Sequence, residues 1–297
     1  MNLTYTVTPE DSGRTVGQLL RQRLGLSAAM VRSLKRIPEG ILLEGDPVFT
    51  NVKPEPGQVI TARSELGRVS EGIAPEPGEL DIVYEDGDLL ILNNPAGIPV
   101  HPTKVYQGGT LANRVMYRME QRGTPGVFHA INRLDKGTSG LVLVAKHKAA
   151  AFYLEGLLDK GLIHRHYMAV LEHGDTLPDS GTVDLPLGRK DGHGIRRAVC
   201  PDGQPAVTHF TVRKRQKGYA LVELRLETGR THQIRAHMSH LGCPVANDFM
   251  YGTEVPGEEG HALHAFRLEI GGDKPLTVTC PVPERFSHYM DMDLEEL

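Results

Sequence analysis

Hydrophobic positions near the N-terminus repeat at a spacing that predicts a helix followed by short strands. The apolar residues between Val16 and Leu24 recur at helical intervals, and Gly25 is placed to end that helix. Ser27 can cap a second helix. Apolar runs at 41–43 and 59–60, bounded by Gly and Pro, then predict short strands. This part of the chain is therefore expected to fold as a small α/β unit.

From about residue 81 onward, period-two runs and helical runs follow each other without a regular repeat. Thr110 is placed to cap a helix that extends to about Gln121. The run 163–170 has a period of two that sets Arg165 and Tyr167 on one face of a strand. Strands mixed irregularly with helices predict an α+β domain with a mixed, mainly antiparallel sheet. Further strands are predicted at 82–84, 89–92, 141–144, 205–212 and 219–226, and further helices at 148–158 and within 228–238.

The domain boundary is expected within residues 64–78, which lack periodicity and are rich in Gly, Pro, Ser and Glu. This linker would separate an N-terminal domain, 1–63, from a large domain, 79–289. The last residues, 290–297, form an acidic tail that is expected to fray.

Length and composition are those of a soluble globular protein. The 297 residues suffice for one large and one small domain, and 39% are hydrophobic and 24% charged. No apolar run reaches the roughly 18 residues that would span a bilayer, and the N-terminus lacks the features of a secretory signal. The three cysteines lie far apart and form no C-x-x-C motif, which fits a reducing compartment. We therefore expect a cytoplasmic protein, monomeric by default, with no obligate protein partner.

The formal net charge of −4 gives no general attraction for nucleic acid, so any RNA affinity has to come from local basic surface. The N-terminal segment offers such a surface, since no acidic residue occurs between Arg14 and Arg36. The order helix, Gly, Ser, helix, strand, turn, strand resembles the S4 RNA-binding domain, although Glu44-Gly45 replaces the usual Asn-Gly turn. A solvated basic helical face is the alternative interpretation. The predicted RNA contacts here are Arg21, Arg23, Arg32, Lys35 and Arg36.

The most informative segment is 129–146, HAINRLDKGTSGLVLVAK. Asp135 runs into a turn in which Gly137 and Gly140 allow a tight bend, because glycine tolerates positive φ. The apolar run that follows joins the turn to a buried strand. A carboxylate and a guanidinium at the lip of a sheet can act on a ribose in RNA. Taken alone, these residues are equally consistent with an ordinary β-turn.

This segment resembles the signature of the RluA/RluD-type RNA pseudouridine synthases, which usually reads His-Arg-Leu-Asp, a short gap, then Thr-Ser-Gly-Leu. Asn132 stands where the family usually has His, and Asn94 replaces the Lys of the family's Asn-Lys-Pro-x-Gly loop. Further blocks follow in the family's order. The resemblance covers 93–102, 132–146, 165–170, 203–208, 228–238, 245–252 and 263–267.

The resemblance implies a pseudouridine synthase fold and an isomerase that converts specific uridines in structured RNA to pseudouridine, with large-subunit ribosomal RNA as the favoured substrate. Asp135 would be the catalytic carboxylate, Arg230 its basic partner, and Tyr167 a ring that stacks on the base. Arg133 matches a residue that enters the space vacated by the flipped nucleotide. Because the product is an isomer, no cofactor is required.

Three alternatives stay open at this point. One is a catalytically inactive RNA-binding protein that retains the synthase fold, motivated by Asn94 and Asn132, and another is a synthase acting on transfer RNA. The third is a metal- or serine-dependent hydrolase. His232, His237 and His240 do not fall on one helix face, and neither an H-E-x-x-H motif nor a G-x-S-x-G elbow occurs. We therefore expect no metal site.

Overall fold

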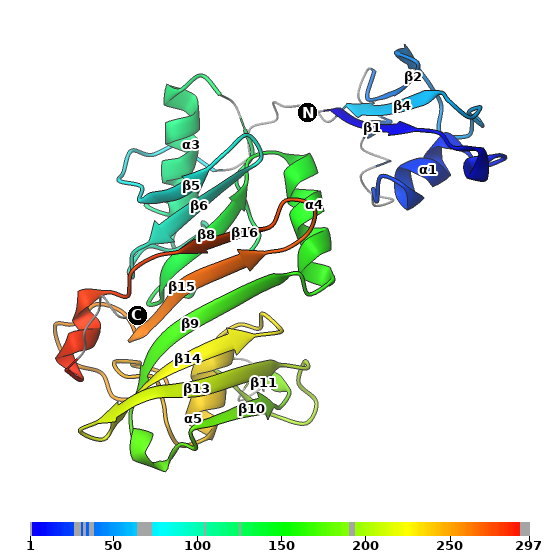
Figure 1. Ribbon diagram of the computed structural model, residues 1–297. Coiled ribbons are helices and arrows are strands. Elements are labelled where there is room, and N and C mark those ends of the chain that lie inside the picture. Colours follow the sequence, from blue (N-terminus) through cyan, green and yellow to red (C-terminus); the bar gives the residue numbers. More distant parts are fainter. Residues whose placement is uncertain are drawn as a thin grey trace.

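The computed structural model describes residues 2–26, 31, 34–35, 39–63, 73–103, 105–124, 126–189 and 194–291. A four-stranded sheet carries the N-terminal part of the chain, and a ten-stranded sheet and a two-stranded sheet carry the rest (Figure 1). Across the described residues, no helix is long and apolar enough to span a membrane.

The N-terminal unit has the strand order β1-β4-β2-β3. It consists of β1 (Asn2–Thr6), α1 (Val16–Gln22), β2 (Ile41–Leu43), β3 (Asp46–Pro47) and β4 (Val59–Arg63), with the short η1 (Pro9–Asp11) before α1. The helix predicted from Val16 is confirmed: the Thr15 side chain caps it, and Gly25 follows with a φ of +67°. The predicted second helix begins at Ser27, outside the described residues. β1 was not predicted, because its sequence NLTYT has a weak apolar pattern.

The large sheet has the order β10-β13-β14-β9-β15-β8-β6-β5, with β16 paired to β15 and β7 paired to β8 (Figure 1). All of its strand pairs are antiparallel except β15 with β8. The predicted α+β fold with a mixed, mainly antiparallel sheet is confirmed. The strands are β5 (Ile82–Glu85), β6 (Leu89–Asn94), β7 (His129–Ala130), β8 (Ser139–Ala145), β9 (Ile163–Leu171), β10 (Ser180–Asp184), β13 (Val207–Gln216), β14 (Tyr219–Leu226), β15 (Leu263–Ile270) and β16 (Leu276–Thr279).

Helices cover both faces of the central strands. One core contains Val142 and Val144 of β8 together with apolar residues of α3 (Leu111–Gln121) and α5 (Gln233–His240). The other contains Leu141 and Leu143 together with α4 (Lys148–Asp159). Because both faces are covered, β8 is a continuous apolar run and every one of its residues is buried. This rigid strand carries the preceding loop, which contains Asp135.

The helix predicted between Thr110 and Gln121 is confirmed with those bounds, because Thr110 and Asn113 form a capping box. The two-stranded sheet of β11 (Leu187–Arg189) and β12 (Arg197–Val199) was not predicted. Its strands are three residues each, too short to show a period.

The structure corrects two predicted boundaries. Residues 73–78 are part of the large domain: Asn113 Nδ2 donates to Ala74 O at 2.7 Å, and Gly109 N donates to Glu76 Oε2 at 2.6 Å. At the other end, Met290 is buried and the Asp291 amide donates to Gln216 Oε1 at 2.8 Å. The predicted bounds of the linker and the tail rested on amino-acid composition. Composition does not show hydrogen bonds to residues that are distant in the sequence. Residues 64–72 and 292–297 lie outside the described part.

Candidate active site

A cavity of about 980 Å³ lies beside the loop between β7 and β8. Its walls come from that loop, from β9, from the segment 226–235, from β11 and β12, and from the loop before α3. Arg133, Asp135, Tyr167 and Arg230 all line it, although they come from three separate segments of the chain. The structure therefore brings the four residues predicted for the large domain to one site.

Two glycines shape the loop that carries Asp135. Gly140 has a φ of +117°, and a Cβ there would lie 2.3 Å from Ala265 O, so β15 can pair with β8 only because this residue is glycine. Gly137 has no positive φ; a Cβ there would lie 2.6 Å from His261 Nε2. The expectation that both glycines serve positive φ is thus correct for Gly140 and wrong for Gly137, which makes room for an imidazole.

Asn132 ties the same loop to β8. Its Nδ2 donates to Leu141 O at 3.0 Å, and its Oδ1 accepts from Leu143 N at 2.8 Å. The side-chain amide therefore acts as one more rung of the strand ladder and is almost fully buried. Asn94, the other departure from the family pattern, is also buried and donates to Ile98 O at 2.8 Å. Both asparagines thus have structural roles beside the site.

The cation beside Asp135 is Arg235. Its Nη1 donates to Asp135 Oδ2 at 2.7 Å, while Arg230 Nε donates to Pro205 O at 3.0 Å. The prediction that Arg230 pairs with the aspartate is therefore wrong. Arg230 precedes α5 and lies before His232, whose φ of +56° turns the chain into the helix. Arg235 lies in the first turn of α5 and can reach the carboxylate. Arg235 lies within the block 228–238 that resembles the family. The sequence does not show where α5 begins, and that start decides which arginine of the block faces Asp135.

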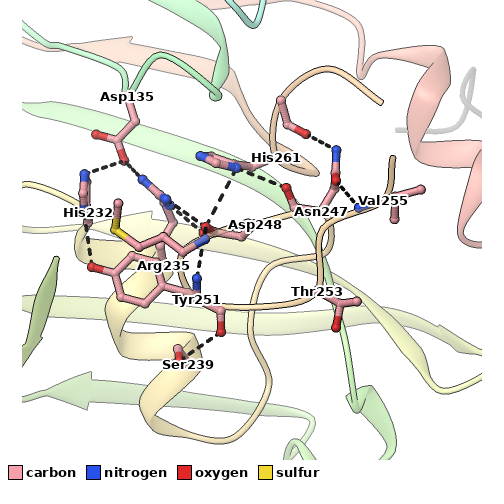
Figure 2. Close-up of polar contacts among 12 residues, drawn as sticks. Asp135, His232, Arg235, Ser239, Asn247, Asp248, Tyr251, Thr253, Val255 and His261 are labelled. Atoms are coloured by element: carbon pink, nitrogen blue, oxygen red, sulfur yellow. Dashed lines mark hydrogen bonds and ion pairs between the residues drawn. The ribbon is translucent and has the colours of Figure 1, made fainter. Parts of the chain in front are cut away.

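A second carboxylate, that of Asp248, binds the Arg235 guanidinium, as Figure 2 shows. Asp248 Oδ2 accepts from Arg235 Nε at 2.6 Å, and Asp248 Oδ1 accepts from Arg235 Nη2 at 2.8 Å. Asp248 is fully buried, and Arg235 is only 3% exposed in its side chain. The ring of Tyr251 packs against the guanidinium, with 5.0 Å between its centroid and Cζ. The guanidinium is thus fixed in one plane and presents Nη1 to Asp135.

Charge pairing overcomes the cost of burying these groups. Burial acts to raise the pKa of Asp248, but the hydrogen bonds and charge of Arg235 outweigh it, so this pKa lies below its usual value. Burial acts to lower the pKa of Arg235, and the two aspartates together raise it above the usual value. Both groups are therefore ionised at neutral pH. Asp135 differs from Asp248 in being 25% exposed, so it remains accessible from the cavity.

Two aromatic side chains complete the immediate surroundings of Asp135. His232 Nε2 lies 3.9 Å from Asp135 Oδ2, and burial lowers the pKa of His232 despite that carboxylate. Its Nδ1 lies 3.1 Å from the hydroxyl of Tyr251. Tyr167 is 5% exposed, and burial raises its pKa, so its phenol is neutral. The period-two prediction that Arg165 and Tyr167 share a face is confirmed, because both line the cavity.

The predicted N-terminal RNA contacts differ in their surroundings. Arg21 and Lys35 are exposed. Arg23 is also exposed, but its Nη2 lies 2.9 Å from Asp11 Oδ1, which also pairs with Arg14. Asp11 precedes the segment that lacks acidic residues, so the sequence argument did not include it. Arg32 and Arg36 lie outside the described residues.

The buried histidine of α5, His237, has structural partners. His237 is fully buried, with Nδ1 2.9 Å from Thr208 Oγ1 and Nε2 3.0 Å from Leu185 O. In the described ranges, no group of three His, Cys, Asp or Glu side chains is placed to hold a metal ion. The absence of a resident metal in the protein stays a prediction.

Comparison with known proteins identifies the family of the chain. Residues 88–240 match the family model of RNA pseudouridylate synthases. The uncharacterized RNA pseudouridine synthase YhcT of Bacillus subtilis is 43% identical over 90% of this chain and 88% of its own length. Ribosomal large subunit pseudouridine synthase D of Vibrio vulnificus is 38% identical over 96% and 92%, respectively. The solved structure of human RNA Pseudouridylate Synthase Domain Containing 1 has a TM-score of 0.57 at 31% identity, over 69% of this chain and 86% of that one.

The fold and the matched sequence are those of an enzyme that isomerises uridine in RNA. The chain belongs to the RNA pseudouridine synthases of the RluA/RluD type. This membership sets aside the alternative of a hydrolase, and the activity assays proposed below test the alternative of an inactive RNA-binding protein.

Proposed function

We propose that Asp135 is the catalytic carboxylate and that this enzyme acts on a uridine of large-subunit ribosomal RNA without a cofactor. One observation carries the proposal: Asp135 is the carboxylate that accepts a hydrogen bond from Arg235 at the edge of the 980 Å³ cavity, where it is open to a substrate. The second carboxylate of the cluster, Asp248, is fully buried and cannot meet RNA.

The reaction breaks the bond between N1 of uracil and C1′ of ribose and then joins C5 to C1′. An ionised carboxylate can promote this step in two ways: it can attack C1′, or it can remove the C2′ proton to give a glycal. Arg235 supports both routes, because its Nη1 places a positive charge 2.7 Å from Asp135 Oδ2 and its hydrogen bond limits the rotation of the carboxylate. The two routes stay open.

A uridine inside a helix has to leave the stack before it can enter the cavity. Extruding a base costs a few kcal/mol of stacking and pairing. Arg133 is exposed at the cavity wall, two residues before Asp135, and a guanidinium can stack and hydrogen-bond in the vacated space. Tyr167 offers a neutral ring to the base inside the cavity.

The proposed substrate class and compartment follow from relatives named ribosomal large subunit pseudouridine synthase D. A bacterial enzyme of that kind would work in the cytoplasm, where the ribosome assembles. The competing candidate is transfer RNA.

The substrate is tested by competition. Purified enzyme is incubated with equal amounts of unmodified large-subunit ribosomal RNA and unmodified transfer RNA, and pseudouridine is mapped at single-nucleotide resolution. We expect conversion at defined ribosomal positions while transfer RNA stays unmodified. Faster conversion in transfer RNA would reverse the substrate assignment, and conversion of neither would contradict the proposed function.

We also propose that the N-terminal unit binds RNA as an S4-like module. Its sheet with α1 and its exposed Arg21 and Lys35 support this role. Changing both residues to Glu is expected to weaken RNA binding and to lower the slope of log K against log salt by about 0.7–0.9 for each lost phosphate contact. A titration of labelled ribosomal RNA at several salt concentrations measures both effects.

The matched control changes Lys214 and Lys217 to Glu, which alters the net charge equally on an exposed hairpin of the large domain. This control should bind RNA as the wild type does. If the two double variants lose the same affinity, only net charge matters and the N-terminal unit makes no specific contact.

A further inference from the structure

Arg165 is a buried arginine that lines the cavity and has no hydrogen-bond or salt-bridge partner among the residues that the structure describes. It is 8% exposed, its position on β9 is two residues from Tyr167, and both side chains line the cavity. Its Nε is buried with no hydrogen-bond partner among the residues that the structure describes. Arg165 also forms no salt bridge with any residue that the structure describes.

The contrast with Arg235 shows why this is unusual. Arg235 is also buried, and the two carboxylates of Asp135 and Asp248 bind its guanidinium. A buried N–H group without an acceptor is costly, because it has lost its contact with water and no protein group replaces it. An arginine retained in this state at the wall of an active site indicates that the substrate supplies the missing acceptors.

The backbone leaves space for the Arg165 head group. A Cβ at Gly229 would lie 2.6 Å from Arg165 Nη1, so a larger residue at 229 would displace the guanidinium. Arg165 and Asp135 also act on the same neighbour, since the charges of both affect the pKa of Tyr167. The guanidinium thus lies near the groups that would surround the base and the ribose.

The chemistry of the reaction identifies the acceptor. When N1–C1′ breaks, its electron pair stays on uracil, which becomes an anion with charge shared by N1, O2 and O4. If Asp135 attacks, C1′ forms an ester with the carboxylate; if Asp135 removes the C2′ proton, the C2′–H electrons form the C1′=C2′ bond. Both routes release the same uracil anion. C5 then bonds to C1′. In the first route the C1′–O bond of the ester breaks and releases the Asp135 carboxylate, and in the second C2′ regains its proton. Finally the C5 proton is lost as N1 is protonated.

We propose that Arg165 binds the carbonyl oxygens of the flipped uracil and stabilises the detached uracil anion until C5 bonds to C1′. This inference rests on the proposed function. A donor fixed in advance where negative charge develops stabilises a transition state more than the ground state. The depth of Arg165 favours the base over the RNA backbone. The exposed cations Arg133, Lys136 and Arg230 of the same cavity are better placed for phosphates, which stay near solvent.

Arg165→Gln tests the inference when binding and chemistry are measured separately. We expect the single-turnover rate on saturating ribosomal RNA to fall about 10²–10³-fold, because one preorganised donor to a developing anion is lost. The RNA dissociation constant and its salt dependence should stay at the wild-type values. A weaker dissociation constant with a smaller salt slope and an unchanged rate would instead assign Arg165 to a phosphate and overturn the proposal.

The control is Arg267→Gln. Arg267 lies on the adjacent strand β15, but its side chain contacts His166, Glu223 and Glu269 and does not line the cavity. The Arg267→Gln substitution removes one positive charge from the same sheet, and it should leave the single-turnover rate unchanged. If Arg165→Gln does not fold, Arg165→Lys replaces it, since lysine keeps the charge but loses the planar fork.

A substrate with a better leaving group separates this role from a merely structural one. Fluorine at C5 makes the uracil anion more stable, so 5-fluorouridine in the RNA should depend less on Arg165. We expect the loss of rate in the Arg165 variant, followed by consumption of the nucleoside, to be smaller with 5-fluorouridine than with uridine. Equal losses on both substrates would mean that Arg165 only supports the fold. Wild-type enzyme that modifies neither RNA would contradict the proposed function itself.

Discussion

Asp135→Asn is expected to lower the rate of pseudouridine formation by at least about 10³-fold, because asparagine can neither attack C1′ nor accept the C2′ proton. The fold should survive, since Asp135 is 25% exposed and Asp248 still binds both Nε and Nη2 of Arg235. RNA binding should also survive, because Arg133 and the other cavity cations are unchanged. Single-turnover assays on RNA carrying tritium at C5 of uridine measure the rate, because that atom is released on conversion.

The control for Asp135→Asn is Asp202→Asn, which removes one exposed carboxylate outside the cavity. It should be as active as the wild type. Tritium release by Asp135→Asn at a rate within a few-fold of the control would remove Asp135 from the reaction.

Asp248→Asn is expected to give the largest loss of stability. It leaves the buried Arg235 guanidinium with only Asp135 as a charged partner, and breaking a buried ion pair costs about 3–5 kcal/mol of unfolding free energy. Activity should fall as well, because Arg235 then no longer holds Asp135 in one orientation. Urea denaturation measures the stability, and the tritium assay measures the activity of the folded fraction.

A double variant separates these two effects. In Arg235→Met with Asp248→Leu, apolar residues replace the pair, and such replacements often restore or raise stability. We expect this double variant to be more stable than Asp248→Asn and still inactive, because Asp135 has lost its cation. If the double variant were active, the ion pair would serve folding alone.

Local signals in the sequence were sufficient for many of the elements. The capped helix from Thr110 and the strands at 82–84 and 89–92 were predicted because a few adjacent residues determine them. The face shared by Arg165 and Tyr167 followed from the period of a single strand. Membership of the family was also predicted, because its motifs occur in order along the chain.

The parts that were missed depend on contacts between distant segments. β15 lies between β8 and β9 although more than ninety residues separate it from β9, and no local pattern indicates that insertion. Asp248 is a single aspartate in a loop, and its role is visible only once Arg235 is packed against it. The confusion of Arg230 with Arg235 has a similar cause. Which of the two arginines faces Asp135 depends on where α5 begins and on the left-handed backbone of His232.

The most direct test of the central claim is a pseudouridine map of large-subunit ribosomal RNA from cells that lack this protein. The map is then repeated after the wild type, Asp135→Asn or Asp202→Asn is restored. The account predicts that defined pseudouridines disappear in the deletion, return with the wild type and Asp202→Asn, and stay absent with Asp135→Asn. Return of those pseudouridines with Asp135→Asn, or no change in the deletion, would contradict it.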